Sequence, residues 1–241
     1  TYYQCIVSAS GNGCNSLTSS EATVTVVPDP VVSDQPDDIT ICDGTSTTLN
    51  VVATGGTGTL LYQWQSSSNG TTFANISGAT SDSYVTPTLN SDTFYKVIVT
   101  QAASGCRVDS NVAKVSVAKI SVQPTTPIDI CVGGVISVSV TTTVVPGTTY
   151  AYQWQSSTNG TVWNNESNAS ATKANFTSDA LSVSTQFRCV VTTTNPSCTL
   201  TSTAVTATVV PDPTIDTQPQ GGTICDGGNF NMSVQASNGT P

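Results

Sequence analysis

The chain has 241 residues, with 15 acidic and 6 basic side chains, no histidine and a formal net charge of −9. So few lysines and arginines argue against nucleic acid and anionic membrane surfaces as partners, because both are bound largely through neutralised phosphates. No apolar stretch approaches the ~20 residues of a membrane-spanning helix, so we expect no membrane span in this sequence. Valine, isoleucine and threonine outweigh the helix formers leucine, glutamate and lysine, which predicts an all-β protein.

Taken in chain order, one set of short strands begins near residue 30. Turn signals separate the strands: Asp43-Gly44, the glycine-rich stretch 55–58, and Asn69-Gly70 as a hairpin signal. Residues 48–53 alternate between apolar and polar side chains, as in a half-buried strand. The expected strands span residues 31–35, 39–42, 48–53, 61–65, 83–86, 93–100 and 111–117.

The same pattern returns about 90 residues later. The decapeptide that begins at Tyr62 recurs almost unchanged from Tyr152, an offset of 90 residues. Gln-Pro at 35–36 recurs at 123–124 and 218–219, and Ile-Cys-x-Gly at 41–44 recurs at 130–133 and 224–227. This period is the size of one β-sandwich domain. We therefore predict domains at 30–118 and 119–211, flanked by the last strands of a truncated domain at 1–29 and the first strands of another at 212–241.

The aromatic positions resemble those of an immunoglobulin-like sandwich. A tryptophan lies on the strand expected at 61–65, which corresponds to the third strand of that sandwich, and an aromatic residue lies two residues before the usual cysteine position of the sixth strand. The resemblance implies tandem immunoglobulin-like β-sandwiches in which four residues form the cores, namely Trp64, Trp154, Tyr95 and Phe187.

A second resemblance concerns the source. The Tyr-Gln-Trp-Gln-Ser-Ser-x-Asn-Gly segment, the Ile-Ser-Gly-Ala-Thr at 76–80 and Gly105-Cys106 resemble repeats of large secreted surface proteins of Bacteroidota. These include adhesins that are exported by the type IX secretion pathway and associated with gliding. The resemblance implies an extracellular or cell-surface location.

The cysteines indicate disulfides. With no histidine and no Cys-x-x-Cys pair, the common zinc spacings are absent, and isolated cysteines are typical of disulfides in an oxidising compartment. The eight cysteines are Cys5, Cys14, Cys42, Cys106, Cys131, Cys189, Cys198 and Cys225.

Their pairing stays open at this point. The usual immunoglobulin disulfide has one cysteine on the second strand. Near that position this chain has valines instead, Val52 and Val140. Counting favours Cys42 with Cys106, the two cysteines of 30–118, and by analogy Cys131 with Cys198. A strict immunoglobulin topology, however, places these two positions near opposite ends of the sandwich. Cys189 matches Cys5 and has no assigned partner.

Catalysis is not expected. Without histidine, a Ser-His-Asp or Cys-His arrangement cannot form. Glu21 and Glu166 lie at unrepeated positions, and Asp82 and Asp92, the only candidates for a carboxylate pair, are more simply solvated turn residues. We expect no cofactor.

An acidic group at a domain junction is a candidate calcium site, since carboxylate oxygens are the ligands that Ca²⁺ prefers. The alternative is that these residues solvate turns and edge strands, because the later repeat reproduces the group only in part. The candidate ligands are Asp29, Asp34, Asp37 and Asp38, with Asp43 nearby.

Three functions fit these features. The first is a structural stalk or filament whose partners are neighbouring repeats, and whose exposed sheet edges could support a homopolymer or lateral fibre. The second is a carbohydrate- or protein-binding module, and the third an accessory segment of an enzyme. Glycosylation also stays open, because Asn-x-Ser/Thr occurs at Asn69, Asn75, Asn159, Asn165, Asn168, Asn175, Asn231 and Asn238.

Overall fold

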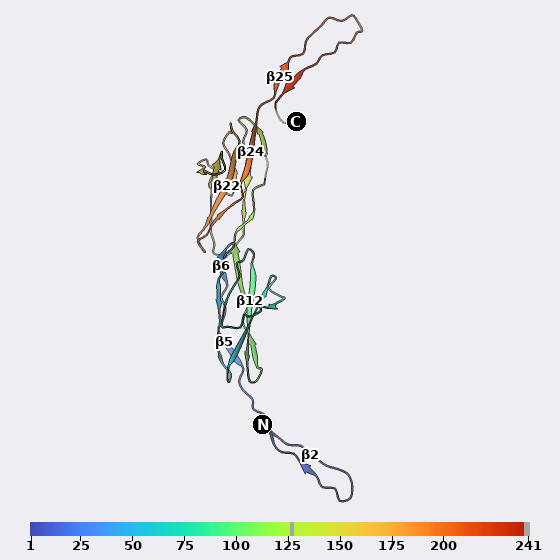
Figure 1. Cartoon of the computed structure of the whole chain (residues 1–241), viewed down its shortest axis with the longest axis vertical. Helices are drawn as coiled ribbons and strands as arrows, with labels where there is room; N and C mark the ends of the chain where they lie inside the picture. Colours follow the sequence, from blue (N-terminus) through green and yellow to red (C-terminus); the bar gives the residue numbers. More distant parts are fainter. Residues whose placement is uncertain (126–127, 239–241) are drawn as a thin grey trace. The chain divides into compact units, whose positions relative to one another are not determined.

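The computed structural model describes residues 1–125 and 128–238, and within these ranges the regular elements are all strands (Figure 1). This confirms the all-β prediction. Contacts between Cα atoms divide the chain into two compact units. One comprises Thr1–Asp38, Thr47–Thr86 and Thr93–Val115, and the other Ile39–Ser46, Pro87–Asp92 and Ser116–Pro241.

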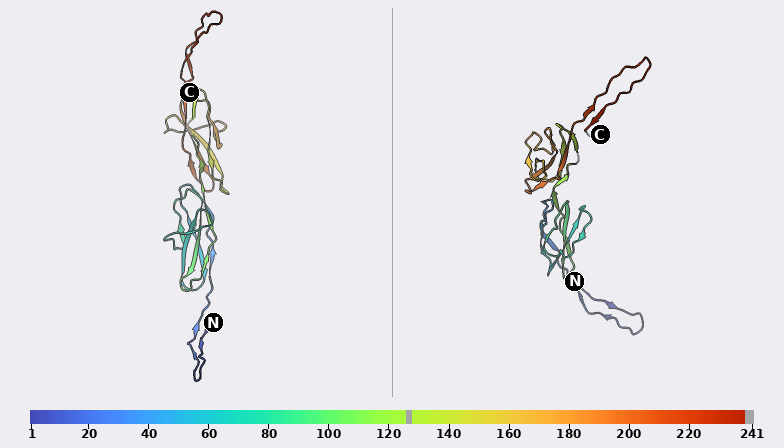
Figure 2. Two further views of the ribbon diagram at one scale, coloured as in Figure 1. Left: turned by 90° about the vertical axis from the view of Figure 1, so that its right-hand side faces the viewer. Right: turned by 45° about the horizontal axis from the view of Figure 1, so that its top comes forward.

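The first repeat folds as two layers of strands (Figure 2). One layer has the order β10-β9-β12-β14-β6, with β13 also paired to β12. The other consists of the ladders β5–β8 and β7–β11, which are continuous because only Val51 separates β7 from β8. The bounds are β5 Pro30–Asp34, β6 Ile39–Cys42, β7 Thr48–Asn50, β8 Val52–Gly55, β9 Leu60–Ser67, β10 Ala74–Asn75, β11 Ser83–Val85, β12 Thr93–Gln101, β13 Arg107–Asp109 and β14 Ala113–Ala118.

The second repeat has the same topology. Its larger sheet has the order β16-β24-β22-β19-β20, with β23 paired to β22, and the other layer contains β15–β18 and β17–β21. The first strand of the large sheet, β16, runs parallel to β24. The bounds are β15 Ile120–Val122, β16 Ile128–Cys131, β17 Ser137–Ser139, β18 Thr141–Thr142, β19 Tyr150–Ser157, β20 Asn164–Asn165, β21 Asn175–Thr177, β22 Thr185–Thr193, β23 Thr199–Thr201 and β24 Val205–Val210.

The repeated Gln-Pro pair closes a gap in the final strand of each sandwich. Gln35 Oε1 accepts a hydrogen bond of 2.8 Å from Asn111 N, and Gln123 Oε1 accepts one of 2.9 Å from Thr203 N. Asn111 lies in the break between β13 and β14, and Thr203 lies in the equivalent break between β23 and β24. A backbone N–H that would otherwise lack a partner is thereby satisfied, which explains why this dipeptide recurs once per repeat.

Three aromatic rings connect the two layers in each sandwich. Trp64 of β9 lies 6.0 Å from Tyr84 of β11, and Tyr84 lies 5.8 Å from Tyr95 of β12. Trp64, Trp154 and both sixth-strand aromatics are buried, as the sequence predicts, with at most 2% of each residue exposed. Burial, with a smaller contribution from Tyr84, raises the pKa of Tyr95 to about 12. The equivalent rings of the second sandwich are Trp154, Phe176 and Phe187, with centroids 5.2 and 5.5 Å apart.

The second-strand core position is one residue earlier than the sequence suggested. Val51 is 4% exposed, whereas Val52 is 49% exposed. Alternate residues of a strand face opposite layers, so an error of one residue moves a side chain from the core to solvent. The buried counterpart in the second repeat is Val140, 89 residues after Val51, as predicted.

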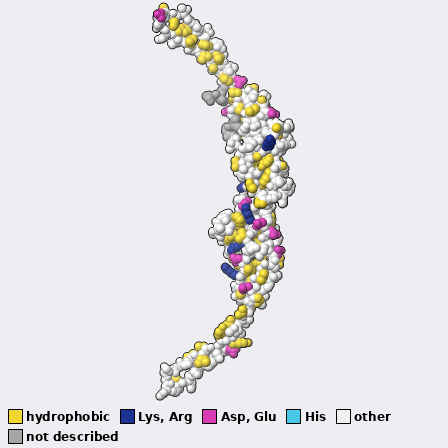
Figure 3. Space-filling model, turned by 180° about the vertical axis from the view of Figure 1, so that it is seen from behind, with side chains coloured by type: hydrophobic (Ala, Val, Ile, Leu, Met, Phe, Trp, Pro, Cys, Tyr) yellow, Lys and Arg dark blue, Asp and Glu magenta, His cyan; other side chains and the backbone are white. Residues whose placement is uncertain are grey.

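The two terminal segments are hairpins with exposed apolar side chains. The first contains β1 Tyr2–Tyr3, β2 Ile6–Val7, β3 Leu17–Thr18 and β4 Ala22–Thr23, and the last contains β25 Thr214–Thr217 and β26 Gln235–Ser237. Figure 3 shows hydrophobic side chains on the surface of both segments. The large apolar residues exposed there include Tyr2, Tyr3, Ile6, Leu17, Ile215, Phe230 and Met232.

We predict that Trp154→Ala destabilises the second sandwich by about 3–5 kcal/mol, because it leaves a cavity beside Phe176 and removes the hydrogen bond from Trp154 Nε1 to Lys173 O. Hydrogen exchange with mass spectrometry should show lost protection in β22 and intact protection in β12. Trp64→Ala is the matched control and should reverse this pattern. Equal loss in both strands would contradict separate cores.

Candidate functional site

The cystine between Cys42 and Cys198 is the candidate functional site. Cys42 ends β6, Cys198 lies in the loop between β22 and β23, and their Cα atoms are 5.7 Å apart. The two intradomain pairs that counting favoured, Cys42–Cys106 and Cys131–Cys198, are therefore wrong. Cys106 and Cys131 carry free thiols.

Strand geometry explains this correction. In the second sandwich Cys131 pairs with Val210, beyond the point where Ala207 meets Thr185 at the start of β22. Cys198, by contrast, is bonded through its carbonyl to Thr193 N at the end of β22. At ~3.3 Å per residue, the nine residues of β22 place these ends about 26 Å apart. A disulfide needs Cα atoms within about 7 Å, so Cys131 cannot reach Cys198.

The bond joins two successive repeats. Cys42 belongs to the repeat at 30–118 and Cys198 to the repeat at 119–211, although both cysteines lie in the second compact unit. Only Lys119 separates β14, the last strand of one repeat, from β15, the first strand of the next. The two repeats are therefore connected by both a one-residue linker and a disulfide.

Hydrogen bonds hold the linker beside this disulfide. Thr143 Oγ1 donates to Val117 O at 2.9 Å and accepts from Lys119 N at 3.0 Å. Asp43, which follows Cys42, donates its backbone N–H to Ala118 O at 3.1 Å. The linker backbone is thus bonded on both sides. A polar hollow of about 220 Å³ next to it is lined by Asp43, Ile120, Gln123, Thr199, Leu200 and Thr201.

Cys189 differs from the other free cysteines. It is fully buried in β22, directly opposite Trp154, and its backbone N–H donates to Ser202 Oγ at 2.8 Å. Burial raises the pKa of its thiol to about 11, although a hydrogen bond with the Gln153 backbone lowers it slightly. Its counterpart in the first repeat is Val97, opposite Trp64. Cys189 therefore acts as a small apolar core residue.

Polar side chains of the repeated Tyr-Gln-Trp-Gln-Ser-Ser-x-Asn-Gly segment form hydrogen bonds to nearby backbone groups. Gln63 Nε2 donates to Trp64 O and Ile76 O, and Asn69 Oδ1 accepts from two backbone N–H groups of its own turn. Both core tryptophans are 0% exposed, so neither offers a ring to a sugar. The exposed side of the sheet carries a cation–ring pair instead, Arg188 with Trp163 at 4.2 Å.

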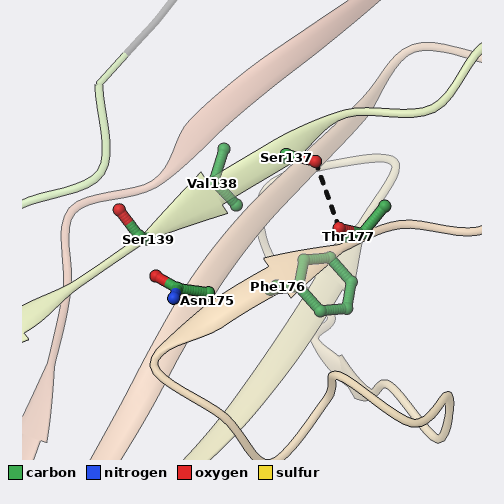
Figure 4. Close-up of a pocket in the computed structure, with 6 residues that line it drawn as sticks. All are labelled: Ser137, Val138, Ser139, Asn175, Phe176 and Thr177. Atoms are coloured by element: carbon green, nitrogen blue, oxygen red, sulfur yellow. Dashed lines mark hydrogen bonds between the residues drawn. The ribbon is translucent and has the colours of Figure 1, made fainter.

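A second hollow, of about 300 Å³, lies over β17 and β21 (Figure 4). Ser137 and Thr177 point toward each other at one end and share a hydrogen bond of 3.1 Å, and Ser139 faces Asn175 at the other. Val138 and Phe176 are buried beneath it. Nothing in the sequence predicts this hollow, because serine, threonine and asparagine occur throughout the chain. Its hydroxyl and amide groups could accept a small polar ligand, but it presents no charged group and no exposed ring.

Two aspartates of the calcium hypothesis accept hydrogen bonds from different parts of the chain. Asp38 Oδ1 accepts a 2.7 Å hydrogen bond from Lys114 N. Asp43 Oδ1 accepts one of 2.9 Å from Asn90 Nδ2. Among residues 1–125 and 128–238, no three acidic or cysteine side chains are grouped as metal ligands would be. Within the same ranges there is also no helix long and apolar enough to span a membrane.

The strand order and the layered aromatic cores define tandem immunoglobulin-like sandwiches. Both repeats match the family described as Domain of unknown function (DUF8696), over residues 33–119 and 123–211. The chain therefore belongs to this family. The comparison with curated proteins found no match.

Solved structures with a related fold include several tandem immunoglobulin proteins. The I-band fragment I67-I69 from titin is 14% identical, with a TM-score of 0.43 over 80% of this chain and 70% of that chain. Extracellular domains 3–5 of Drosophila OTK are 16% identical, with a TM-score of 0.36 over 86% and 70%. Sidekick-1 immunoglobulin domains 1–4 are 14% identical, with a TM-score of 0.42 over 87% and 57%.

We predict that Cys42→Ser lowers the free energy of unfolding under oxidising conditions. The bond closes a loop between residues 156 apart in sequence, worth roughly 5 kcal/mol on the chain-entropy model. Urea denaturation with and without a thiol reductant measures the loss. The reduced wild-type chain should match the variant, and unchanged wild-type stability on reduction would contradict the bond.

A pH dependence follows from Cys189. Its pKa rises from an ordinary 9.0 to about 11 on folding, so between these values the unfolded chain loses a proton that the folded chain keeps. The free energy of unfolding should therefore be unaffected by this group below pH 9 and fall as the pH rises above it. Cys189→Val, which copies Val97, should fold normally and lose less stability from pH 9 to 11. Tyr95 is present in both chains, so the difference between them reports Cys189. Identical pH profiles would contradict the prediction.

Proposed function

We propose that this chain is a tension-bearing stalk segment of a large extracellular surface protein, of the adhesin type exported by Bacteroidota through type IX secretion. The observation that carries the proposal is the disulfide between Cys42 and Cys198, which joins successive repeats across a one-residue linker. Such a bond limits how far two neighbouring repeats can separate under load, which is the property that a tether requires. Its immediate partners are then neighbouring repeats of the same protein.

The same bond supports an extracellular or cell-surface location. Disulfides persist in oxidising compartments and are reduced in the cytosol. Cys198 is only 5% exposed, but Cys42 lies partly at the surface, where a cytosolic reductant would reach it. The low density of charge and the absence of histidine agree with a spacer that has no chemistry of its own.

The position of the disulfide determines which residues a pulling force would act on. Force applied at the two ends enters through β5 and β6, crosses from Cys42 to Cys198, and leaves through β23 and β24. The segment between the two cysteines, which contains most of both repeats and all three tryptophans, lies off this path. Tension therefore acts on the end strands, which contribute Ile41, Val205 and Ala207 to the cores, and bypasses the segment that carries the aromatic clusters.

Single-molecule stretching of the full chain tests this proposal. Oxidised protein should not release the segment between Cys42 and Cys198, and a thiol reductant should add about 500 Å of contour length, at ~3.3–3.6 Å for each of these residues. Cys42→Ser is the matched control and should reach full length without reductant. Full extension of the oxidised wild-type chain would contradict a tether of this kind.

The location needs a separate measurement. Antibodies against this chain should label intact, unpermeabilised cells of the source organism, and protease added outside the cells should remove the signal. Labelling only after permeabilisation would contradict a surface stalk.

A further inference from the structure

Four other cysteines occupy the two positions that the disulfide joins. Cys131 and Cys225 follow Cys42 by 89 and 183 residues, each within an Ile-Cys-x-Gly segment. Cys14 and Cys106 precede Cys198 by 184 and 92 residues. The first group is called here the strand-end cysteines (Cys42, Cys131, Cys225), and the second the loop cysteines (Cys14, Cys106, Cys198).

The strand-end cysteines share one local backbone structure. A glycine two residues later adopts a left-handed conformation in all three, with φ of 73° at Gly44, 81° at Gly133 and 78° at Gly227. The cysteine carbonyl accepts a hydrogen bond from the turn that follows it in each case, at 3.1, 2.9 and 3.0 Å. Cys131 and Cys225 are exposed. Each therefore presents its thiol from the same turn as the bonded Cys42.

The loop cysteines of the two complete repeats also share their setting. The carbonyl of Cys106 accepts from Gln101 N at 2.8 Å, and that of Cys198 accepts from Thr193 N at 3.0 Å. Gln101 and Thr193 are the last residues of the equivalent strands β12 and β22. Cys106 is half-buried and carries a free thiol. Its loop is thus anchored in the same way as the loop that bonds to Cys42.

Neither group can pair inside its own repeat. The strand-end and loop positions of one sandwich lie at opposite ends of its central strand, about 26 Å apart by the length of β22. The one observed bond instead runs from a strand-end cysteine to the loop cysteine of the following repeat. Cys106 and Cys131 would need partners one repeat further along in each direction, at positions that the printed sequence does not include.

We infer that successive repeats are joined by a disulfide ladder, in which the strand-end cysteine of each repeat bonds to the loop cysteine of the next. Cys131 then bonds to a loop cysteine of a repeat that follows 119–211, and Cys106 to a strand-end cysteine of a repeat that precedes 30–118. Each bond joins two thiols with loss of two protons and two electrons, which a protein thiol–disulfide oxidoreductase accepts by reduction of its own disulfide. The inference extends the proposed stalk function and rests on it.

The ladder would make the stalk almost inextensible. The bonded cysteines are 156 residues apart, whereas the repeat is about 90 residues long, so neighbouring loops overlap. The shortest covalent path along the stalk crosses the disulfide from Cys42 to Cys198 and follows the backbone for 27 residues to Cys225. There it crosses the next disulfide to a later repeat. Only those 27 of every 183 residues carry tension, while the remaining residues stay off the path.

Cys189 provides an internal reference for the test. It is buried opposite Trp154, belongs to neither group, and has no place in the ladder. An alkylating reagent should therefore leave its thiol unmodified until the protein is unfolded.

The experiment uses the full chain with one pair of repeats duplicated: residues 1–211 followed directly by residues 29–241. Val-Pro-Asp-Pro occurs at both 27–30 and 210–213, so the new join keeps the natural sequence. This chain contains a junction of the kind the printed sequence lacks, in which 119–211 is followed by a copy of 30–118. After oxidative refolding, thiols are alkylated and disulfide-linked peptides are identified by mass spectrometry without reduction.

The expected result is a new bond between Cys131 of the first copy and Cys106 of the second, beside a Cys42–Cys198 bond in each copy. Cys106→Ser in the second copy should leave Cys131 of the first copy open to alkylation and preserve both Cys42–Cys198 bonds. If both Cys42–Cys198 bonds form and Cys131 remains a thiol, the ladder is overturned while the stalk proposal stands. Linkage of Cys42 to Cys106 within one repeat would overturn it as well.

Discussion

Burial of an aromatic cluster between two sheets is the interaction on which this structure depends. In each repeat a tryptophan of the large sheet contacts an aromatic ring of the opposite layer, which contacts a third ring on the neighbouring strand of the large sheet. Such rings bury 150–250 Å² each, and their burial is the main favourable contribution in a domain of this size. Because each repeat buries its own cluster, the repeats can be added one after another.

The second level of organisation is covalent. The aromatic clusters stabilise each sandwich by itself, but they contribute nothing across the one-residue linker at Lys119. The Cys42–Cys198 bond supplies that connection and also determines which residues a pulling force would reach. The polar residues that recur in every repeat serve the same framework, since Gln63, Asn69 and Gln123 all bond to nearby backbone groups.

Local sequence predicted most of the strands but not their details. The expected strands at 39–42, 61–65 and 93–100 correspond to β6, β9 and β12. The short strands β10 and β13 are not predicted, since two or three residues are too few to carry a periodic signal and depend on a neighbouring strand for their hydrogen bonds. The buried valine was misplaced by one residue. The 89-residue spacing shared by Val51 and Val140, and by Cys42 and Cys131, would have identified it.

The sequence by itself determined the fold class, the period of about 90 residues and the buried aromatic residues, because these depend on composition, spacing and local hydrophobic pattern. Only the tertiary structure decided which cysteines bond. A disulfide requires two Cα atoms within about 7 Å, and the residues that meet this condition are 156 positions apart, in different repeats. Counting cysteines within one repeat could not find such a pair, since the length of β22 keeps the nearer candidates at opposite ends of the sandwich.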